Sequence, residues 1–206
     1  MRLTGMTNTT DNPNPLILLD IDGVINDLNA LGGLDRDWGI DQVYSHGHMV
    51  HIPDYMGWLI RQLTDVAEVH WCTTWRHRAN DEIAEHLGIE QLPVVDDGTR
   101  SRFVDWKAAA AHDLAEAAIK AGRKVLWIED FYGHLPIDEM PKGVEFVDTA
   151  ANDEMVLEID MLPDWLLQLF NSTPVRCNPA LASNTACLPV PQPSSSTEPE
   201  STPYFL

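Results

Sequence analysis

Short apolar runs alternate with amphipathic helical patterns along the middle of this chain, and that alternation limits the folds open to it. The apolar runs cover 16–19, 69–72, 92–95, 125–128 and 144–147, and each has the length of a buried strand. Helical patterns follow at 54–66, 80–87, 106–121 and 164–170. Strands that alternate with helices pair in parallel and are covered by helices on both faces. The sequence therefore predicts an α/β fold with a three-layer, Rossmann-like parallel sheet of about five strands.

Composition changes at both ends of this alternating region. Residues 171–206 hold seven of the fourteen prolines, with Ser, Thr and Asn between them, and residues 1–14 are mostly short and polar. Such segments bury too little apolar surface to offset the entropy lost on ordering. We expect disordered ends at 1–14 and 171–206 and one folded domain over 15–170, a common domain size.

Charge and cysteine content exclude several functions. The net charge of −19 argues against non-specific nucleic-acid binding, which depends on Lys and Arg neutralising phosphates, but permits a nucleotide held through a metal ion. Three cysteines without a CxxC pair indicate neither a disulfide scaffold nor a zinc site. The first residues lack the apolar core of a signal peptide, and no apolar stretch is long enough for a membrane span. We expect a cytoplasmic protein.

Polar side chains follow the predicted strands where each apolar run ends. They are Asp20 and Asp22 after the first run, Thr73, Thr74, Trp75 and Arg76 after the second, Asp96 and Asp97 after the third, and Glu129 and Asp130 after the fourth. Lys107 lies near the start of the helix that leads into the fourth run. Ligands of parallel sheets bind beyond the carboxyl ends of the strands. Carboxylates, a hydroxyl and a lysine gathered there suit a divalent cation that holds a phosphate.

Each of these groups has a role in phosphate chemistry. Mg²⁺ takes carboxylate and carbonyl oxygens, here from Asp20, from Glu129 or Asp130, and from the backbone carbonyl of Asp22. Asp20 can attack phosphorus to give an aspartyl-phosphate, and Asp22 can carry the proton to the leaving oxygen and from water. The positive charge of Lys107 neutralises phosphoryl oxygens, to which the Thr73 hydroxyl can also donate.

The segment LLDIDGVIN (18–26) resembles the first motif of the haloacid dehalogenase (HAD) superfamily, in the DxD form of its phosphatases. Thr73 of WCTTW, Lys107 of VDWKAAA and the acidic pair of WIEDF match the second, third and fourth motifs in order. The segments HIPDYMGWLIRQL, VHWCTTWRHRAND and QLPVVDD are similar to the Swiss Army Knife type of RNA-repair domain within the superfamily. The resemblance covers about 16–170. It implies a Mg²⁺-dependent phosphomonoesterase whose partner is a phosphorylated substrate, a nucleotide or an RNA or DNA end.

Two departures from the superfamily pattern affect the expected site. Glu129 stands where the fourth motif usually has an aspartate, so we favour Asp130 as the metal ligand, with Glu129 as the alternative. The insertion at 27–53 is too short for the folded cap domain that many members carry. The resemblance therefore implies a capless enzyme with an open site.

Residues after the second motif are candidates for substrate binding. These candidates are Thr74, Trp75, Arg76, Arg78 and Asn80. An Arg fork suits phosphate, and Trp75 can stack on a base. The alternative for the group is a salt bridge at a helix entry together with core packing, and Asp96 and Asp97 are expected to form a turn. The spacing of His46, His48 and His51 fits no zinc pattern, so we expect a substrate-facing loop there.

Two other functions are compatible with the same fold. A binding module can keep the fold without catalysis, although the complete set of acids, Thr and Lys speaks against it. A phosphomutase would use the same nucleophile, but the missing cap disfavours it.

Overall fold

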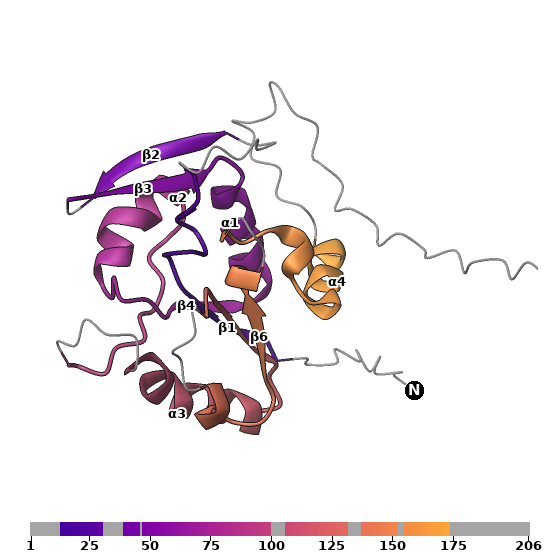
Figure 1. The fold of residues 1–206 in the computed structure, drawn as a ribbon. Coiled ribbons are helices and arrows are strands. Elements are labelled where there is room, and N and C mark those ends of the chain that lie inside the picture. The colour runs from indigo at the N-terminus through magenta and orange to yellow at the C-terminus, as the bar shows by residue number, and fades with distance from the viewer. Residues whose placement is uncertain are drawn as a thin grey trace, which may run out of the picture.

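A four-stranded parallel sheet forms the centre of the molecule (Figure 1). The computed structural model describes residues 13–30, 39–45, 47–99, 106–131, 137–151 and 155–173. The strands are β1 (Leu16–Leu19), β4 (Glu68–Trp71), β5 (Val125–Glu129) and β6 (Val144–Asp148), in the order β4-β1-β5-β6. The α/β fold expected from the alternating pattern is confirmed.

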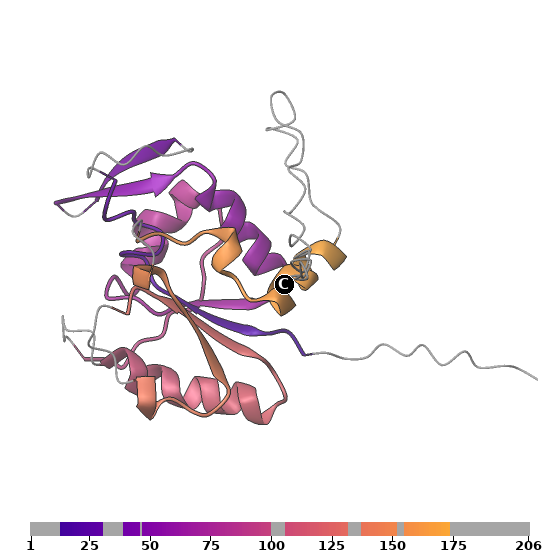
Figure 2. The same ribbon diagram turned by 45° about the vertical axis from the view of Figure 1, so that its right-hand side comes forward.

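Helices cover both faces of this sheet (Figure 2). Helices α1 (Met56–Val66) and α4 (Asp164–Ser172) lie on one face, and α3 (Trp106–Lys120) lies on the other. Alternate residues of β1 serve the two layers, because successive side chains of a strand point to opposite faces. Ile17 and Leu19 pack into the cluster that contains α1 and α4, whereas Leu16 and Leu18 pack into the cluster that contains α3. This double burial explains why the strand reads as an unbroken apolar run.

Helix α1 packs closely against the helical segment that follows β4. That segment begins with η1 (Ala79–Ala84), which is wound as a π-helix, and continues as α2 (Glu85–Leu87) to a left-handed Gly88. A Cβ at Gly57 would lie 2.6 Å from the backbone oxygen of Leu87. The two helices approach this closely because Gly57 has no side chain.

The expected strand at 92–95 is wrong. The structure has only a single parallel bridge between Trp71 and Val94 there, so the sheet has four strands rather than five. Pro93 has no N–H to donate to a ladder. The side chain of Asn80 takes both polar backbone groups of Leu92, accepting from its N–H and donating to its carbonyl at 2.8 Å each. A side chain thus replaces ladder bonds that another strand would make.

The insertion after the first motif contains an antiparallel hairpin of β2 (Ile40–Ser45) and β3 (His48–Pro53). Val43, Val50 and Ile52 turn toward the core of the α1 layer, while Tyr44 is exposed. The hairpin is smaller than a cap domain, but it corrects the expectation of a simple loop.

The histidines of this insertion also differ from expectation. His48 and His51 lie in β3, and His51 is buried rather than turned toward a substrate. His46 lies outside the described residues, as does most of each end that we expected to be disordered. Residues 171 and 172, which we assigned to the tail, belong to α4. None of the helices in the described part of the chain is long and apolar enough to cross a membrane.

Candidate active site

Polar residues from three strands meet beyond the carboxyl edge of the sheet. The chain leaves β1 for β4 on one side and later adds β5 on the other, so β1 is the switch point where ligands of such sheets bind. Asp20 follows β1, while Glu129 ends β5 and Asp130 comes directly after it. One carboxylate oxygen from each of these three acids lies within 4.8 Å of the others. The sequence identified these three residues from their places at strand ends.

Lys107 reaches this acidic group from the first turn of α3. Its Nζ lies 3.0 Å from Oδ2 of Asp20 and donates to both carboxylate oxygens of Glu129 at 2.8 and 2.9 Å. The exposed fractions are 1% for Lys107, 4% for Asp20 and 1% for Glu129. Burial lowers the pKa of Lys107, but the neighbouring charges of Asp20 and Glu129 outweigh burial and raise it. The ammonium therefore keeps its proton.

The cluster holds more potential negative charge than Lys107 can balance. Burial, and then the charge of Asp20, raise the pKa of Glu129. The same two causes raise the pKa of Asp130 to about 6. Oδ1 of Asp20 is buried and has no hydrogen-bond partner in the described part of the chain. An all-oxygen donor set with surplus charge and an unsatisfied oxygen fits a hard divalent cation such as Mg²⁺.

Gly23 makes room for Asp130. Its φ of +72° is in the left-handed region that glycine adopts without strain. A Cβ at this position would lie 2.6 Å from the Cβ of Asp130 and 2.7 Å from its Oδ2. The glycine after Asp22 therefore allows the acid after β5 to approach the first motif.

Asp22 lies in a different environment from the three clustered acids. Its Oδ2 accepts the indole N–H of Trp75 at 2.8 Å, and its Oδ1 accepts the side-chain N–H of Asn26 at 2.9 Å. Trp75 is buried, so its ring packs in the core while its N–H serves Asp22. Asn26 was not among the residues expected from the sequence to form the site. An amide four residues after a candidate acid, within the same tight turn, is the signal that could have found it.

Thr73 comes directly after Cys72 at the end of β4 and is fully buried. Its Oγ1 accepts a hydrogen bond from the backbone N–H of Trp75 at 3.3 Å. Because the oxygen accepts in this bond, the hydroxyl proton can still be donated to another acceptor. Thr74, the next candidate, is half-buried.

Two of the remaining candidates for substrate binding, Arg76 and Asn80, already have partners within the protein. Arg76 pairs with Asp96 and, at 3.0 Å, with Asp97, and its guanidinium lies 3.9 Å from the ring centre of Trp106. This is the helix-entry salt bridge that we kept as an alternative. The amide of Asn80 is occupied by Leu92 and by the indole of Trp71, so we assign it to packing.

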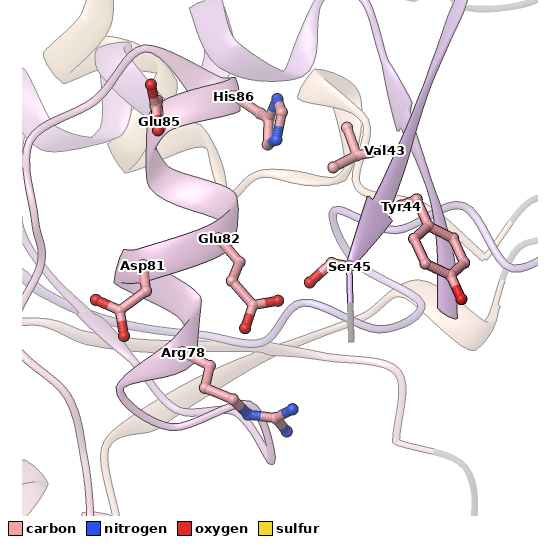
Figure 3. A pocket seen from close by; sticks show the side chains of 8 residues that line it. All are labelled: Val43, Tyr44, Ser45, Arg78, Asp81, Glu82, Glu85 and His86. Atoms are coloured by element: carbon pink, nitrogen blue, oxygen red, sulfur yellow. The ribbon is translucent and has the colours of Figure 1, made fainter. Parts of the chain in front are cut away.

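Arg78 is exposed and lies at one end of a hollow of about 570 Å³ between β2 and the η1–α2 segment (Figure 3). The lining residues are Val43, Tyr44, Ser45, Arg78, Asp81, Glu82, Glu85 and His86. None of the clustered acids lines the hollow, so it lies beside the candidate site rather than at it. Its three carboxylates make it a poor track for a polyanion.

Comparison with known proteins gives little that bears on this site. The chain matches no protein-family model. It also matches none of the curated proteins. A solved structure of a protein provisionally identified as 3-deoxy-D-manno-octulosonate 8-phosphate phosphatase, from Vibrio cholerae, matches over 80% of this chain and 89% of that one. The identity is 18% and the TM-score is 0.41. Similarity this weak carries no argument, so the fold follows from the sheet itself and the chemistry from the residues at its edge.

Proposed function

We propose that this chain is a Mg²⁺-dependent phosphomonoesterase of the HAD superfamily, with Asp20 as the nucleophile. The observation that carries the proposal is the buried group at the switch point of the sheet. Asp20 there lies 3.0 Å from the ammonium of Lys107, and its carboxylate lies within 4.8 Å of those of Glu129 and Asp130. A structural ion pair needs one acid for one base, whereas this site gathers three acids, two of which pair with a single lysine.

The residues divide the work by their charge and position. Asp20, Asp130 and Glu129 would hold Mg²⁺, which, when bound, neutralises phosphoryl oxygens as they approach the nucleophile. Lys107 holds one oxygen of Asp20 and adds a fixed positive charge beside the phosphoryl group. The Thr73 hydroxyl would donate to a phosphoryl oxygen.

The reaction has two steps. In the first, a carboxylate oxygen of Asp20 bonds to phosphorus and the bond from phosphorus to the leaving alcohol breaks. Asp22 gives its proton to the leaving oxygen. In the second, Asp22 takes a proton from water, the water attacks the aspartyl-phosphate, and inorganic phosphate leaves with Asp20 restored.

The proposed substrate is the terminal phosphate of a nucleotide or of a nucleic-acid end. Two observations support this class. The segments at 51–63, 69–81 and 91–97 resemble the RNA-repair type of domain, and the described part of the insertion is a hairpin rather than a folded cap. The acidic hollow and the net charge of −19 disfavour long contacts with a polynucleotide backbone. We therefore propose that the site binds the terminal phosphate of a nucleic acid and not its polynucleotide backbone.

The Asp20→Asn variant tests the proposal. Turnover of p-nitrophenyl phosphate, mononucleotides, 3′- and 5′-phosphorylated oligonucleotides and sugar phosphates would be measured with Mg²⁺ and with EDTA. We expect activity with Mg²⁺ only and less than about a hundredth of it in Asp20→Asn, because an essential nucleophile carries more than that. Asp113→Asn, at a side chain that is 99% exposed on α3, is the matched control and should be fully active. Activity that survives Asp20→Asn would refute the proposed nucleophile. A wild type that binds these esters but turns over none of them would instead indicate a binding module.

A further inference from the structure

Both carboxylate oxygens of Asp22 are held by buried, uncharged donors. The indole N–H of Trp75 bonds to one oxygen at 2.8 Å and the amide N–H of Asn26 to the other at 2.9 Å. Trp75 is 7% exposed and Asn26 is 6% exposed. An indole and an amide donate only through N–H groups that stay neutral, so they fix the direction of the carboxylate without adding a counter-charge.

Asp20, two residues earlier, has the opposite arrangement. Its partner is the ammonium of Lys107, and its carboxylate belongs to the cluster with Glu129 and Asp130, from which the carboxylate of Asp22 is absent. The two acids of the DxD pair are therefore separated by the donors that the fold supplies to each. Asp22 is thus held by two neutral donors, whereas Asp20 belongs to the group that would hold a cation.

The amide of Asn26 is oriented from behind by the hairpin. Its Oδ1 accepts the backbone N–H of His51 at 2.9 Å, and the backbone N–H of Asp27 donates to the carbonyl of His51 at 2.8 Å. Because the oxygen end of the amide is used by β3, the NH₂ end must face Asp22. The hairpin therefore sets one of the two bonds to Asp22.

The indole of Trp75 is oriented by the turn after β4. The backbone N–H of Trp75 donates to Oγ1 of Thr73, and the next residue, Arg76, has a left-handed φ of +53°. Arg76 is fastened at its far end by Asp97 and by the ring of Trp106. The salt bridge of Arg76 at the helix entry thus stabilises the turn, and the turn sets the direction of the indole N–H of Trp75.

We propose that Trp75 and Asn26 are positioning residues that hold Asp22 for proton transfer to the leaving oxygen. The inference rests on the proposed function. It adds Trp75 and Asn26 to the residues that this chemistry requires, which already included the acids, Thr73 and Lys107. A positioned general acid contributes on the order of 10² to 10⁴ in rate, and part of this factor is lost when the acid turns away. The loss depends on how much the leaving group needs a proton.

The test is a series of aryl phosphates that ranges from p-nitrophenyl to unsubstituted phenyl phosphate. Nitrophenolate leaves without a proton, whereas phenolate needs help, and kcat/KM reports the step in which the ester bond breaks. We expect Trp75→Phe to lower kcat/KM about tenfold or more for phenyl phosphate and less than about threefold for p-nitrophenyl phosphate. Asn26→Ala should make kcat/KM depend on the leaving group in the same way. This variant tests the inference if Trp75→Phe does not fold.

Trp71→Phe is the matched control. Trp71 is also a buried indole, but it donates its N–H to Asn80 at 2.8 Å and not to Asp22. Its loss should change both esters by the same factor. If Trp75→Phe and Asn26→Ala also change both esters equally, their role is structural and the inference is overturned. If Asp20→Asn retains activity on both esters, the proposed function fails instead, and the two failures are thereby distinguished.

Discussion

Glu129 and Asp130 are neighbours in the chain but have different partners. Both oxygens of Glu129 accept from Lys107, and Trp127 donates its indole N–H to one of them at 3.2 Å. Asp130 is half-buried, and its pKa is raised to about 6 by burial and by the charge of Asp20. Both oxygens of Glu129 are therefore already engaged by donors of this chain, whereas Asp130 is more open to solvent.

This difference predicts which acid a cation depends on. Asp130→Asn should weaken Mg²⁺ binding about tenfold or more, while Glu129→Gln should weaken it less because Lys107 already shares that charge. Calorimetric titration with MgCl₂ measures both constants. A larger loss in Glu129→Gln would show that the longer side chain is the main ligand.

The contact of α1 with α2 gives a prediction at the scale of elements. Replacing Gly57 by Ala favours the helix by roughly 0.5–1 kcal/mol. It also places a Cβ 2.6 Å from the backbone oxygen of Leu87, which cannot move without moving α2. Such overpacking costs about 1–3 kcal/mol, so we expect Gly57→Ala to lower the free energy of unfolding by about 1–2 kcal/mol. Urea unfolding measures the change, and Asp65→Ala, an exposed change in the same helix, should stay within about 0.5 kcal/mol. If Gly57→Ala is more stable than the wild type, α2 moves to accommodate the new Cβ and the prediction is wrong.

Elements were predictable where one apolar run carried the signal. The strand runs of β1, β4, β5 and β6 were identified within a residue of their ends. Burial on both faces explains the unbroken apolar runs of the central strands β1 and β5, whereas the edge strands β4 and β6 also carry exposed polar residues. The run at 92–95 failed because it pairs with β4 only around Trp71, while the side chain of Asn80 takes the polar backbone groups of Leu92. The β2–β3 hairpin was missed because its alternating pattern is too short to predict strands by itself. Its apolar residues are buried only because the hairpin packs against the α1 layer.

In the candidate site, too, positions that follow from single elements were predictable, whereas contacts between residues far apart in the chain were not. Strand ends predicted the acids, and the start of the helix before the fourth apolar run predicted Lys107, since the topology brings these positions to one edge. The bond from Trp75 to Asp22 joins residues 53 positions apart and depends on the geometry of two turns. No periodicity in the sequence contains that information.

The charge of the cluster makes the stability of the whole molecule depend on pH. The raised pKa of Asp130 means that the folded protein binds this proton more tightly than the unfolded chain does. Its contribution to stability is complete below the unfolded pKa of about 4 and is lost as the pH rises through about 6. In the proposed function, a bound cation would replace the proton above that pH.

Mg²⁺ should therefore stabilise the protein more at pH 7.5 than at pH 5. At a concentration of 100 times its Kd, a ligand specific to the native state adds about 2.7 kcal/mol, which is roughly 5–10 °C in Tm for a chain of this size. Thermal melts with MgCl₂ and with EDTA at both pH values measure the gain, and Asp130→Asn should lose most of the pH dependence. Equal gains at pH 5 and 7.5 in the wild type would contradict the role of Asp130.

The ion group of Lys107, Asp20 and Glu129 also has a consequence for how the chain assembles. Its three members come from α3, β1 and β5, and each is almost completely removed from water. If this end of the sheet is buried without Lys107, two carboxylates lose water without a counter-ion, and if α3 is buried elsewhere, an ammonium is buried alone. Either error costs several kcal/mol, much of the margin of a typical domain. The buried ion group thus also disfavours misassembled chains, because only the native arrangement brings its three charged members together.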